Sequence, residues 1–287
     1  MSPKFGLSLS LAVLLATPVL AQAPVPPRPS PNAKVEQSVG VSKITVTYSR
    51  PGVKGREIYG GLVPWGEVWR TGANEATLFE TSHEATIGGK TLPAGKYAFF
   101  TIPNKDKWTL IWNRQAEQWG AGNYKPEEDA LKVDVAAQKM PAQERFEIRF
   151  LDADDTTAKV EVRWADVLVP FEVVFDTKKL AIEEGRAAAA KASNKDEARA
   201  LSGWATYAYQ NNLAPAEAEA WIAKAAAEND SYRIHALHAR LLAKNGKKAE
   251  AKAAAEKALA RAAGADKDAF GVADDSAKLK TELASWK

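Results

Sequence analysis

The chain has 287 residues, no cysteine and a formal net charge of +3, with 39 basic and 36 acidic side chains. The absence of cysteine excludes disulfide bonds, thiolate catalysis and zinc sites built from cysteine. The near balance of charge, without a cluster of lysine and arginine, excludes a strongly basic surface and argues against nucleic acid as a partner.

The N-terminal segment is typical of a cleaved secretory signal. Lys4 precedes an apolar run from Gly6 to Ala16, and small residues follow, so we expect cleavage after Ala21 or Ala23. The alternative, a membrane anchor, would need about 20 apolar residues. The sequence therefore predicts a signal peptide over residues 1–23, export to the periplasm or the cell exterior, and no membrane span after cleavage.

Residues 24–33 are rich in proline and begin PVPPRPSPN. Proline fixes the backbone dihedral φ near −65° and removes a hydrogen-bond donor, which favours an extended chain. We therefore predict a linker here.

Apolar residues alternate with polar residues from residue 34 onwards, as in VGVSKITVTYS around Val39 to Tyr48. Further runs of this kind, rich in β-branched and aromatic residues, cover 76–82, 96–102, 107–113, 131–135, 145–151, 158–164 and 167–175. Gly88 and Gly89 suit a tight hairpin turn, and the polar run from Asp152 to Thr156 suits a loop. About nine strands without helices between them predict an antiparallel β-sandwich over residues 34–176, of jelly-roll or immunoglobulin-like type.

Residues 177–287 are rich in alanine, lysine and glutamate, which are strong helix formers. Stop signals divide this region into candidate helices over 178–193, 196–211, 215–228, 231–244, 247–263 and 274–286. Residues 214–226 match residues 247–259 at an offset of 33, which is typical of tetratricopeptide repeats. The whole chain is thus predicted to be α+β, with an all-α, tetratricopeptide-like domain after the sandwich.

The stretch from Tyr48 to Glu80 has no sustained period and combines tryptophan, arginine and glycine. A long loop inside a β domain is usually functional or packed upon itself, and both readings stay open. Indole rings offer stacking area and guanidinium groups offer planar donors, so this stretch and the glycine-rich run from Trp119 to Tyr124 are candidate binding surfaces. The candidate ligand-binding residues are Arg50, Arg56, Trp65, Trp69, Arg70, Thr71, Asn74, Glu75, Trp119 and Tyr124.

Several long motifs resemble a known family. YSRPGVKGREIYGGLVPWGEVWRTGANEAT, IGGKTLPAGKYAFFTIP, KWTLIWN and WGAGNYKPEEDALKVDV are similar to bacterial exported proteins catalogued as domain of unknown function 2911, over about residues 33–175. The helical tail ending in LASWK also resembles the tail of many members. The resemblance implies a β domain with an Arg-Thr-Gly-Ala-Asn-Glu segment, here Arg70 to Glu75, and implies no activity.

Other candidate sites lack complete motifs. His235 and His238 stand three residues apart on a predicted helix but have no further metal ligands at a recognisable spacing. His83 could act as a general base, yet no nucleophile motif accompanies it. The aspartates of the run from Asp152 to Asp155 lack the glycine and glutamate of a calcium loop. We expect no metal and no cofactor.

The sequence therefore favours a non-catalytic exported binding or scaffold protein. In this hypothesis the β domain binds a small ligand, such as a carbohydrate or peptide of the cell envelope, and the helical repeats bind a protein partner. The alternative is a hydrolase acting on envelope carbohydrate or peptide, with Glu75 and Arg70, or His83, as acid–base groups. Under the first hypothesis no residue is assigned as catalytic.

Overall fold

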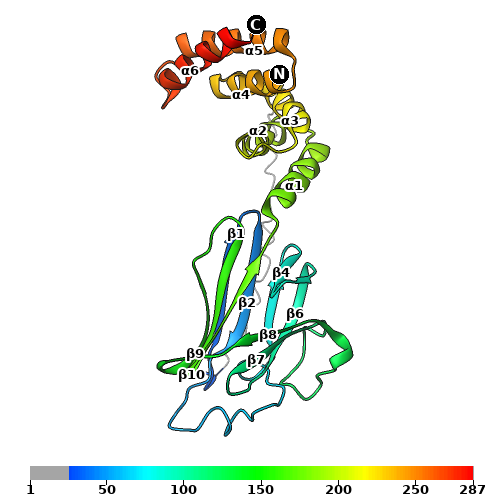
Figure 1. Cartoon of the computed structure of the whole chain (residues 1–287), viewed down its shortest axis with the longest axis vertical. Coiled ribbons are helices and arrows are strands. Elements are labelled where there is room, and N and C mark those ends of the chain that lie inside the picture. The colour runs from blue at the N-terminus through cyan, green and yellow to red at the C-terminus, as the bar shows by residue number, and fades with distance from the viewer. Residues whose placement is uncertain (1–25, 287) are drawn as a thin grey trace, which may run out of the picture.

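The computed structural model describes residues 26–286 (Figure 1). Within this range ten strands precede six helices, so the predicted α+β organisation is confirmed. The strands are β1 (Asn32–Val39), β2 (Ser42–Ser49), β3 (Thr77–Thr81), β4 (Ala85–Ile87), β5 (Lys90–Leu92), β6 (Gly95–Ile102), β7 (Lys107–Asn113), β8 (Asp129–Ala136), β9 (Gln138–Leu151) and β10 (Thr157–Val174). The helices are α1 (Thr177–Lys191), α2 (Lys195–Gln210), α3 (Pro215–Glu228), α4 (Tyr232–Lys244), α5 (Lys248–Ala263) and α6 (Val272–Ser285). The predicted signal peptide lies outside the described residues.

Two antiparallel sheets face each other and form the predicted sandwich. The larger sheet has the strand order β1-β2-β3-β6-β7-β8, and the smaller has the order β5-β4-β10-β9. Alternate residues of a strand point to the same face, so the inner faces contribute one shared apolar core. Its largest fully buried side chains are aromatic and include Trp108, Trp112, Trp164, Phe79 and Phe146.

The outer face of the larger sheet is also covered. Ala98, Phe100 and Ile111 are buried there beneath Val68 and Tyr124, which come from two long loops. A strand that is buried on both faces needs apolar residues at consecutive positions. This explains why β6 reads YAFF instead of alternating.

Two details differ from the expected strands. The run from Val39 to Tyr48 is not one strand, because it contains the turn between β1 and β2. Gly40 has a φ of +55° there, which favours glycine. Conversely, the runs over 158–164 and 167–175 belong to the single strand β10, which is interrupted by irregular register around Ala165 (φ +51°). Such bulges redirect side chains.

The helices begin directly after β10. The Asp176 carboxylate accepts a hydrogen bond of 3.1 Å from the Lys179 amide and thereby caps α1. Consecutive helices pack against each other and extend away from one end of the sandwich (Figure 1). Burial repeats at the predicted offset of 33 residues: the fully buried pairs include Ala218 and Ala251, Ile222 and Ala255, and Ala225 and Ala258.

Candidate functional site

The long segment between β2 and β3 lies at the end of the sandwich opposite the helices (Figure 1). Its tip is buried, because Ile58, Tyr59 and Val63 are each at most 9% exposed. Backbone hydrogen bonds of 2.8 Å from Gly60 to Val63 and from Val63 to Ile58 hold this tip. The segment therefore packs on itself and against the core at this end of the sandwich. Its other side chains line two cavities.

Trp69 and Thr71 anchor the WRTGANEA motif. The Trp69 backbone pairs with Thr101 through hydrogen bonds of 2.8 and 2.9 Å, and its ring stacks on Trp164 with centroids 5.8 Å apart. Thr71 is fully buried, and its hydroxyl lies 3.1 Å from the Thr101 hydroxyl. Thr77 donates to the Thr71 carbonyl at 2.7 Å. These contacts give the motif a fixed shape.

Asn74 and Glu75 hold the proline-rich linker. The Asn74 side-chain amide donates to the Ser30 carbonyl at 3.3 Å, and Arg28 donates to both Glu75 oxygens at 2.7 and 3.0 Å. The hydrogen bonds from Arg28 lower the pKa of Glu75 below its ordinary value. A general acid needs a raised pKa. The environment of Glu75 is therefore opposite to the one that the hydrolase hypothesis required.

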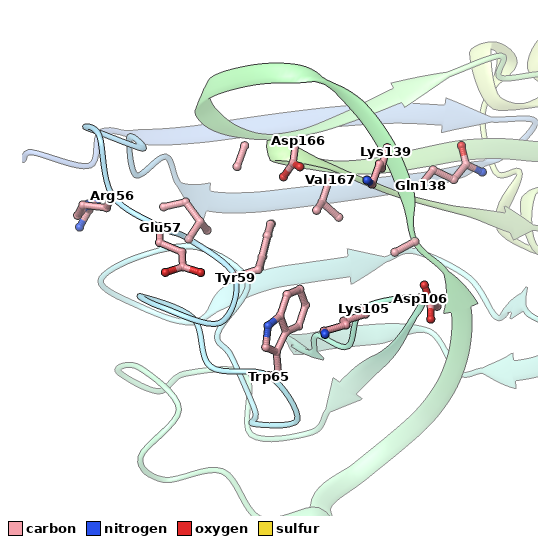
Figure 2. A pocket seen from close by; sticks show the side chains of 13 residues that line it. Arg56, Glu57, Tyr59, Trp65, Lys105, Asp106, Gln138, Lys139, Asp166 and Val167 are labelled. Atoms are coloured by element: carbon pink, nitrogen blue, oxygen red, sulfur yellow. The ribbon is translucent and has the colours of Figure 1, made fainter.

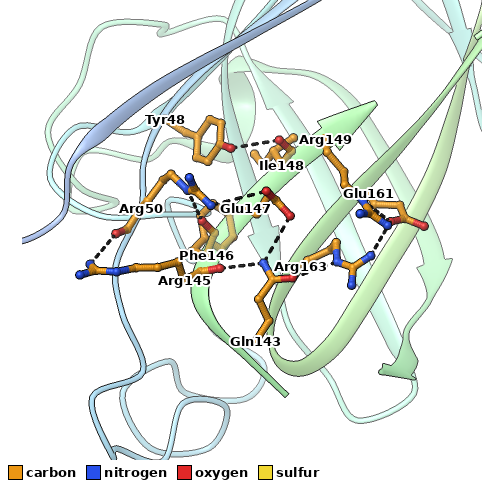
Figure 3. Close-up of polar contacts among 10 residues, drawn as sticks. All are labelled: Tyr48, Arg50, Gln143, Arg145, Phe146, Glu147, Ile148, Arg149, Glu161 and Arg163. Atoms are coloured by element: carbon orange, nitrogen blue, oxygen red, sulfur yellow. Dashed lines mark hydrogen bonds and ion pairs between the residues drawn. The ribbon is translucent and has the colours of Figure 1, made fainter. Parts of the chain in front are cut away.

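Arg50 forms hydrogen bonds between the two sheets and does not line a cavity at this end of the sandwich. Its guanidinium donates to the Phe146 carbonyl of β9 at 2.9 Å and lies 3.5 Å from Glu147, as Figure 3 shows. Tyr48, two residues earlier, donates to the Ile148 carbonyl at 3.0 Å. Tyr48 and Arg50, two residues apart, thus bind the Ile148 and Phe146 carbonyls, which are two residues apart on β9.

The two aromatic residues of the glycine-rich loop lie apart from these contacts. Tyr124 packs on Phe100 and donates to an Asp129 oxygen at 2.7 Å. Trp119 is 64% exposed and makes no ring contact with the described residues. Its backbone nevertheless forms a bridge with Glu75, so this loop lies beside the WRTGANEA motif.

Trp65 and Tyr59 form the floor of a cavity of about 680 Å³, which we call the Trp65 cavity (Figure 2). Trp65 is 37% exposed, and its ring lies over Tyr59 with centroids 5.8 Å apart and planes inclined by 31°. The other walls come from the β6–β7 turn, the start of β9 and the irregular part of β10. The lining residues are Arg56, Glu57, Ile58, Tyr59, Trp65, Lys105, Asp106, Ala137, Gln138, Lys139, Ala165, Asp166 and Val167.

The charged side chains around the Trp65 cavity form no ion pairs with other described residues. They are Arg56, Glu57, Lys105, Asp106, Lys139 and Asp166. Elsewhere in the sandwich such pairs do form, as where Glu161 binds Arg149 at 2.8 Å and Arg163 at 3.1 Å. The Trp65 cavity thus combines an aromatic floor with donors and acceptors that are available to a ligand.

The Tyr59 hydroxyl adds a further donor. It makes no hydrogen bond with any residue of the described range. Burial, with a smaller contribution from the negative charge of Asp166, raises the pKa of Tyr59 above its ordinary value. The hydroxyl therefore stays protonated at neutral pH and can donate to a bound molecule.

A neighbouring cavity of about 320 Å³, which we call the Arg70 cavity, shares Arg56 with the first. The Arg70 Nε atom is buried and has no hydrogen-bond partner within residues 26–286. The lining residues are Ser30, Pro51, Arg56, Leu62, Val63, Val68, Trp69, Arg70, Gly72, Ala73, Ala121 and Trp164. Two of the predicted arginines and one predicted tryptophan thus meet here.

His83 connects the sandwich to the first helix. Its Nδ1 atom lies 2.9 Å from the Ser82 hydroxyl, and its Nε2 atom lies 3.2 Å from Glu184 of α1. A serine, a histidine and a carboxylate that are linked in this order by side-chain hydrogen bonds are the polar groups of a hydrolase triad. None of these three residues lines any of the five cavities found among residues 26–286.

The histidines of the tail, His235 and His238, lie on α4. His235 binds Asp230 at 2.8 Å, and burial lowers the pKa of His238. In the described part of the chain, no three histidine, aspartate or glutamate side chains are grouped so that they could hold a metal ion.

Sequence reasoning identified one wall of each cavity and missed the opposite wall. Arg56, Trp65, Trp69 and Arg70 were predicted, and they lie around the two cavities. Tyr59 was not predicted, because an isolated tyrosine carries no motif. Lys139 and Asp166 were missed because the strands that bring them to Trp65 lie about 75 to 100 residues further along the chain. The only local sign was the break in alternation after Trp164.

Comparison with known proteins gives one match. A profile of the family described as protein of unknown function (DUF2911) matches residues 30–173, about half of the chain. The match begins just before β1 and ends within β10, so it spans the sandwich and excludes the helices. No curated protein and no solved structure matches. Among residues 26–286, none of the helices is long and apolar enough to span a bilayer.

Proposed function

Because the chain belongs to the DUF2911 family, whose description assigns no activity, we propose from its geometry that it is a non-catalytic binding protein. Its ligand is a short saccharide that binds in the Trp65 cavity. The observation that carries this proposal is the partly exposed Trp65 ring lying over buried Tyr59, surrounded by six charged side chains without ion pairs.

The mixture of donors and acceptors favours a neutral ligand rich in hydroxyl groups. A hydroxyl group both donates and accepts hydrogen bonds, so it can bind carboxylates such as Asp166 and ammonium groups such as Lys139 alike. The apolar face of a sugar ring can lie on the Trp65 indole, which supplies contact area at low entropic cost. A volume of about 680 Å³ is within the range of small-molecule sites.

Isothermal titration of the protein with the trisaccharide of N-acetylglucosamine tests the proposal, with a tetrapeptide of alanine, glutamate and lysine as the alternative ligand. We expect saccharide binding that is weakened at least about fivefold in Trp65→Ala, as for an aromatic residue central to a binding site. Trp119→Ala is the matched control, because Trp119 is exposed and lies outside this cavity. Binding of the peptide alone, no binding, or equal affinity in Trp65→Ala would contradict the proposal.

We propose separately that the helical region is a tetratricopeptide-like array that binds a protein segment. The recurrence of buried positions at an offset of 33 supports the repeat. A groove of about 430 Å³ lies between α2, α4 and the start of α6, and Phe270 at its edge is 92% exposed. An exposed aromatic residue beside a groove is a suitable anchor for a partner. Retention of a binding partner by the protein but not by Phe270→Ala, in a pull-down from the envelope fraction, tests this.

Export is also part of the proposal and rests on the N-terminal sequence pattern. N-terminal sequencing of the protein recovered from fractionated cells tests it. Chains that begin at Gln22 or Pro24 in the periplasm or medium would support export, and an intact Met1 in the cytoplasm would contradict it.

A further inference from the structure

The Arg70 cavity contains a guanidinium group that no part of the described protein satisfies. Arg70 Nε is buried without a hydrogen-bond partner, and the Arg70 side chain forms no ion pair within residues 26–286. By contrast, the Arg149 and Arg240 guanidiniums each bind carboxylates at 2.8 to 3.1 Å. A buried donor without a partner costs stability, and such groups are rare in folded proteins unless they have a function.

The charge of the Arg70 cavity favours an anion. Arg56 and Arg70 are its only charged lining residues, and no aspartate or glutamate lines it. Arg56 is held by the carbonyls of Val53 and Gly52 at 3.0 and 2.5 Å, which fixes the position of the second positive charge. Two cations beside one small cavity attract a negatively charged group, and a guanidinium binds a carboxylate through two parallel hydrogen bonds.

The apolar residues that line the Arg70 cavity indicate the chemistry of the rest of the ligand. Trp69, Trp164, Val63, Val68 and Ala121 supply apolar surface. Gly72 and Ala73 also line the cavity, and neither backbone amide donates to a described residue. An inorganic phosphate would leave the apolar walls without a partner. A molecule with one anionic end and an apolar body would match both parts of the cavity.

We infer that the Arg70 cavity is a binding site for the carboxylate group of a small organic acid or of a peptide C-terminus. The carboxylate binds Arg70, with Arg56 adding positive charge, and the apolar part lies against Trp69 and Trp164. The site is preorganised, because the paired backbone of Trp69 and the buried hydroxyl contacts of Thr71 hold Arg70 on both sides. This site shares Arg56 with the Trp65 cavity but is otherwise lined by different residues, and the inference does not depend on saccharide binding there.

Isothermal titration of the full chain with isocaproate, isocaproamide and inorganic phosphate tests the inference, together with N-acetyl-alanyl-leucine and its C-terminal amide. We expect either or both carboxylates to bind. We expect the uncharged amides and phosphate to bind at least about tenfold more weakly, because charge-assisted bidentate bonds are lost. Binding by isocaproate identifies a free acid as sufficient, and binding by the dipeptide alone identifies a peptide C-terminus. Equal binding of acid and amide, preference for phosphate, or no binding of either carboxylate would overturn the inference.

Substitutions test whether Arg70 itself binds the carboxylate. Arg70→Gln should weaken carboxylate binding at least about tenfold, and Arg70→Lys should weaken it less because the charge remains while the planar fork is lost. Arg114→Gln is the matched control, since Arg114 is exposed and lines neither cavity. Unaltered affinity in Arg70→Gln, with near-ultraviolet circular dichroism showing a folded protein, would refute the assignment.

Discussion

Replacement of Arg70 by methionine should stabilise the protein while removing a binding group. The Arg70 Nε atom is buried without a partner, and a buried unsatisfied donor costs about 1–3 kcal/mol. Methionine has a similar length and no polar group, so it removes this cost and keeps most of the apolar contacts. Because the Arg70 side chain is only partly buried, we expect a gain of about 1 kcal/mol in the free energy of unfolding.

The gain can be measured by urea unfolding followed by tryptophan fluorescence, since five tryptophans lie close to or within the sandwich core and report its loss. They are Trp65, Trp69, Trp108, Trp112 and Trp164. Arg149→Met provides a control of opposite sign. Its guanidinium binds the buried Glu161 at 2.8 Å, so this variant should lose about 1–3 kcal/mol. If Arg70→Met were destabilised to a similar degree as Arg149→Met, Arg70 would have a structural role and the reasoning would be refuted.

Three further substitutions test the packing of the fold and the contact that holds the linker. Gly185→Ala would place a Cβ atom 2.6 Å from the Trp221 ring, so thermal unfolding by circular dichroism should show a loss of about 1–3 kcal/mol. Gly40→Ala, where φ is +55° and a Cβ atom would meet Thr177, should cost about 1–3 kcal/mol in the same assay. Glu75→Gln should speed amide hydrogen exchange at Arg50, whose amide donates to the Pro31 carbonyl of the linker at 2.9 Å, because the bond from Arg28 that holds the linker is weakened. The Arg28–Glu75 ion pair should persist above pH 4.5, the ordinary pKa of Glu75. It should weaken as the pH falls through the lowered pKa of Glu75, and the free energy of unfolding should then fall by about 0.2–1 kcal/mol. Wild-type stability in either glycine variant, or unchanged exchange at Arg50, would contradict the contact concerned.

Local sequence patterns were sufficient for most elements. The helix from Pro215 to Glu228 was predicted with its observed bounds, because Pro215 is favoured in a first turn and Asn229 follows the last helical residue. Gly88 and Gly89 likewise predicted the β4–β5 turn, in which both have positive φ. Patterns were misleading where an alternation continued through a turn at Gly40, and where a bulge at Ala165 divided one strand into two apparent ones.

The candidate residues of the WRTGANEA motif illustrate the limit of such reasoning. Arg70, Thr71, Asn74 and Glu75 are neighbours in sequence, yet their contacts point in different directions. Thr71 is buried in the fold, Asn74 and Glu75 bind the linker, and Arg70 lies in a cavity. Residue types alone indicated a polar site. Only the contacts distinguish a residue that holds the linker from one that is available to a ligand. The binding role of these residues stays a prediction.

The sequence by itself determined the order and type of the elements, the sandwich followed by helices, the family and one wall of each cavity. These depend on periodicity, turn residues and motifs, which are local properties of the chain. Only the tertiary structure decided that Tyr59, Lys139 and Asp166 meet Trp65, and that Arg70 lies in a cavity without a carboxylate. The pairing of strands brings residues together from distant parts of the chain, and the presence or absence of a partner for a charge depends on that pairing.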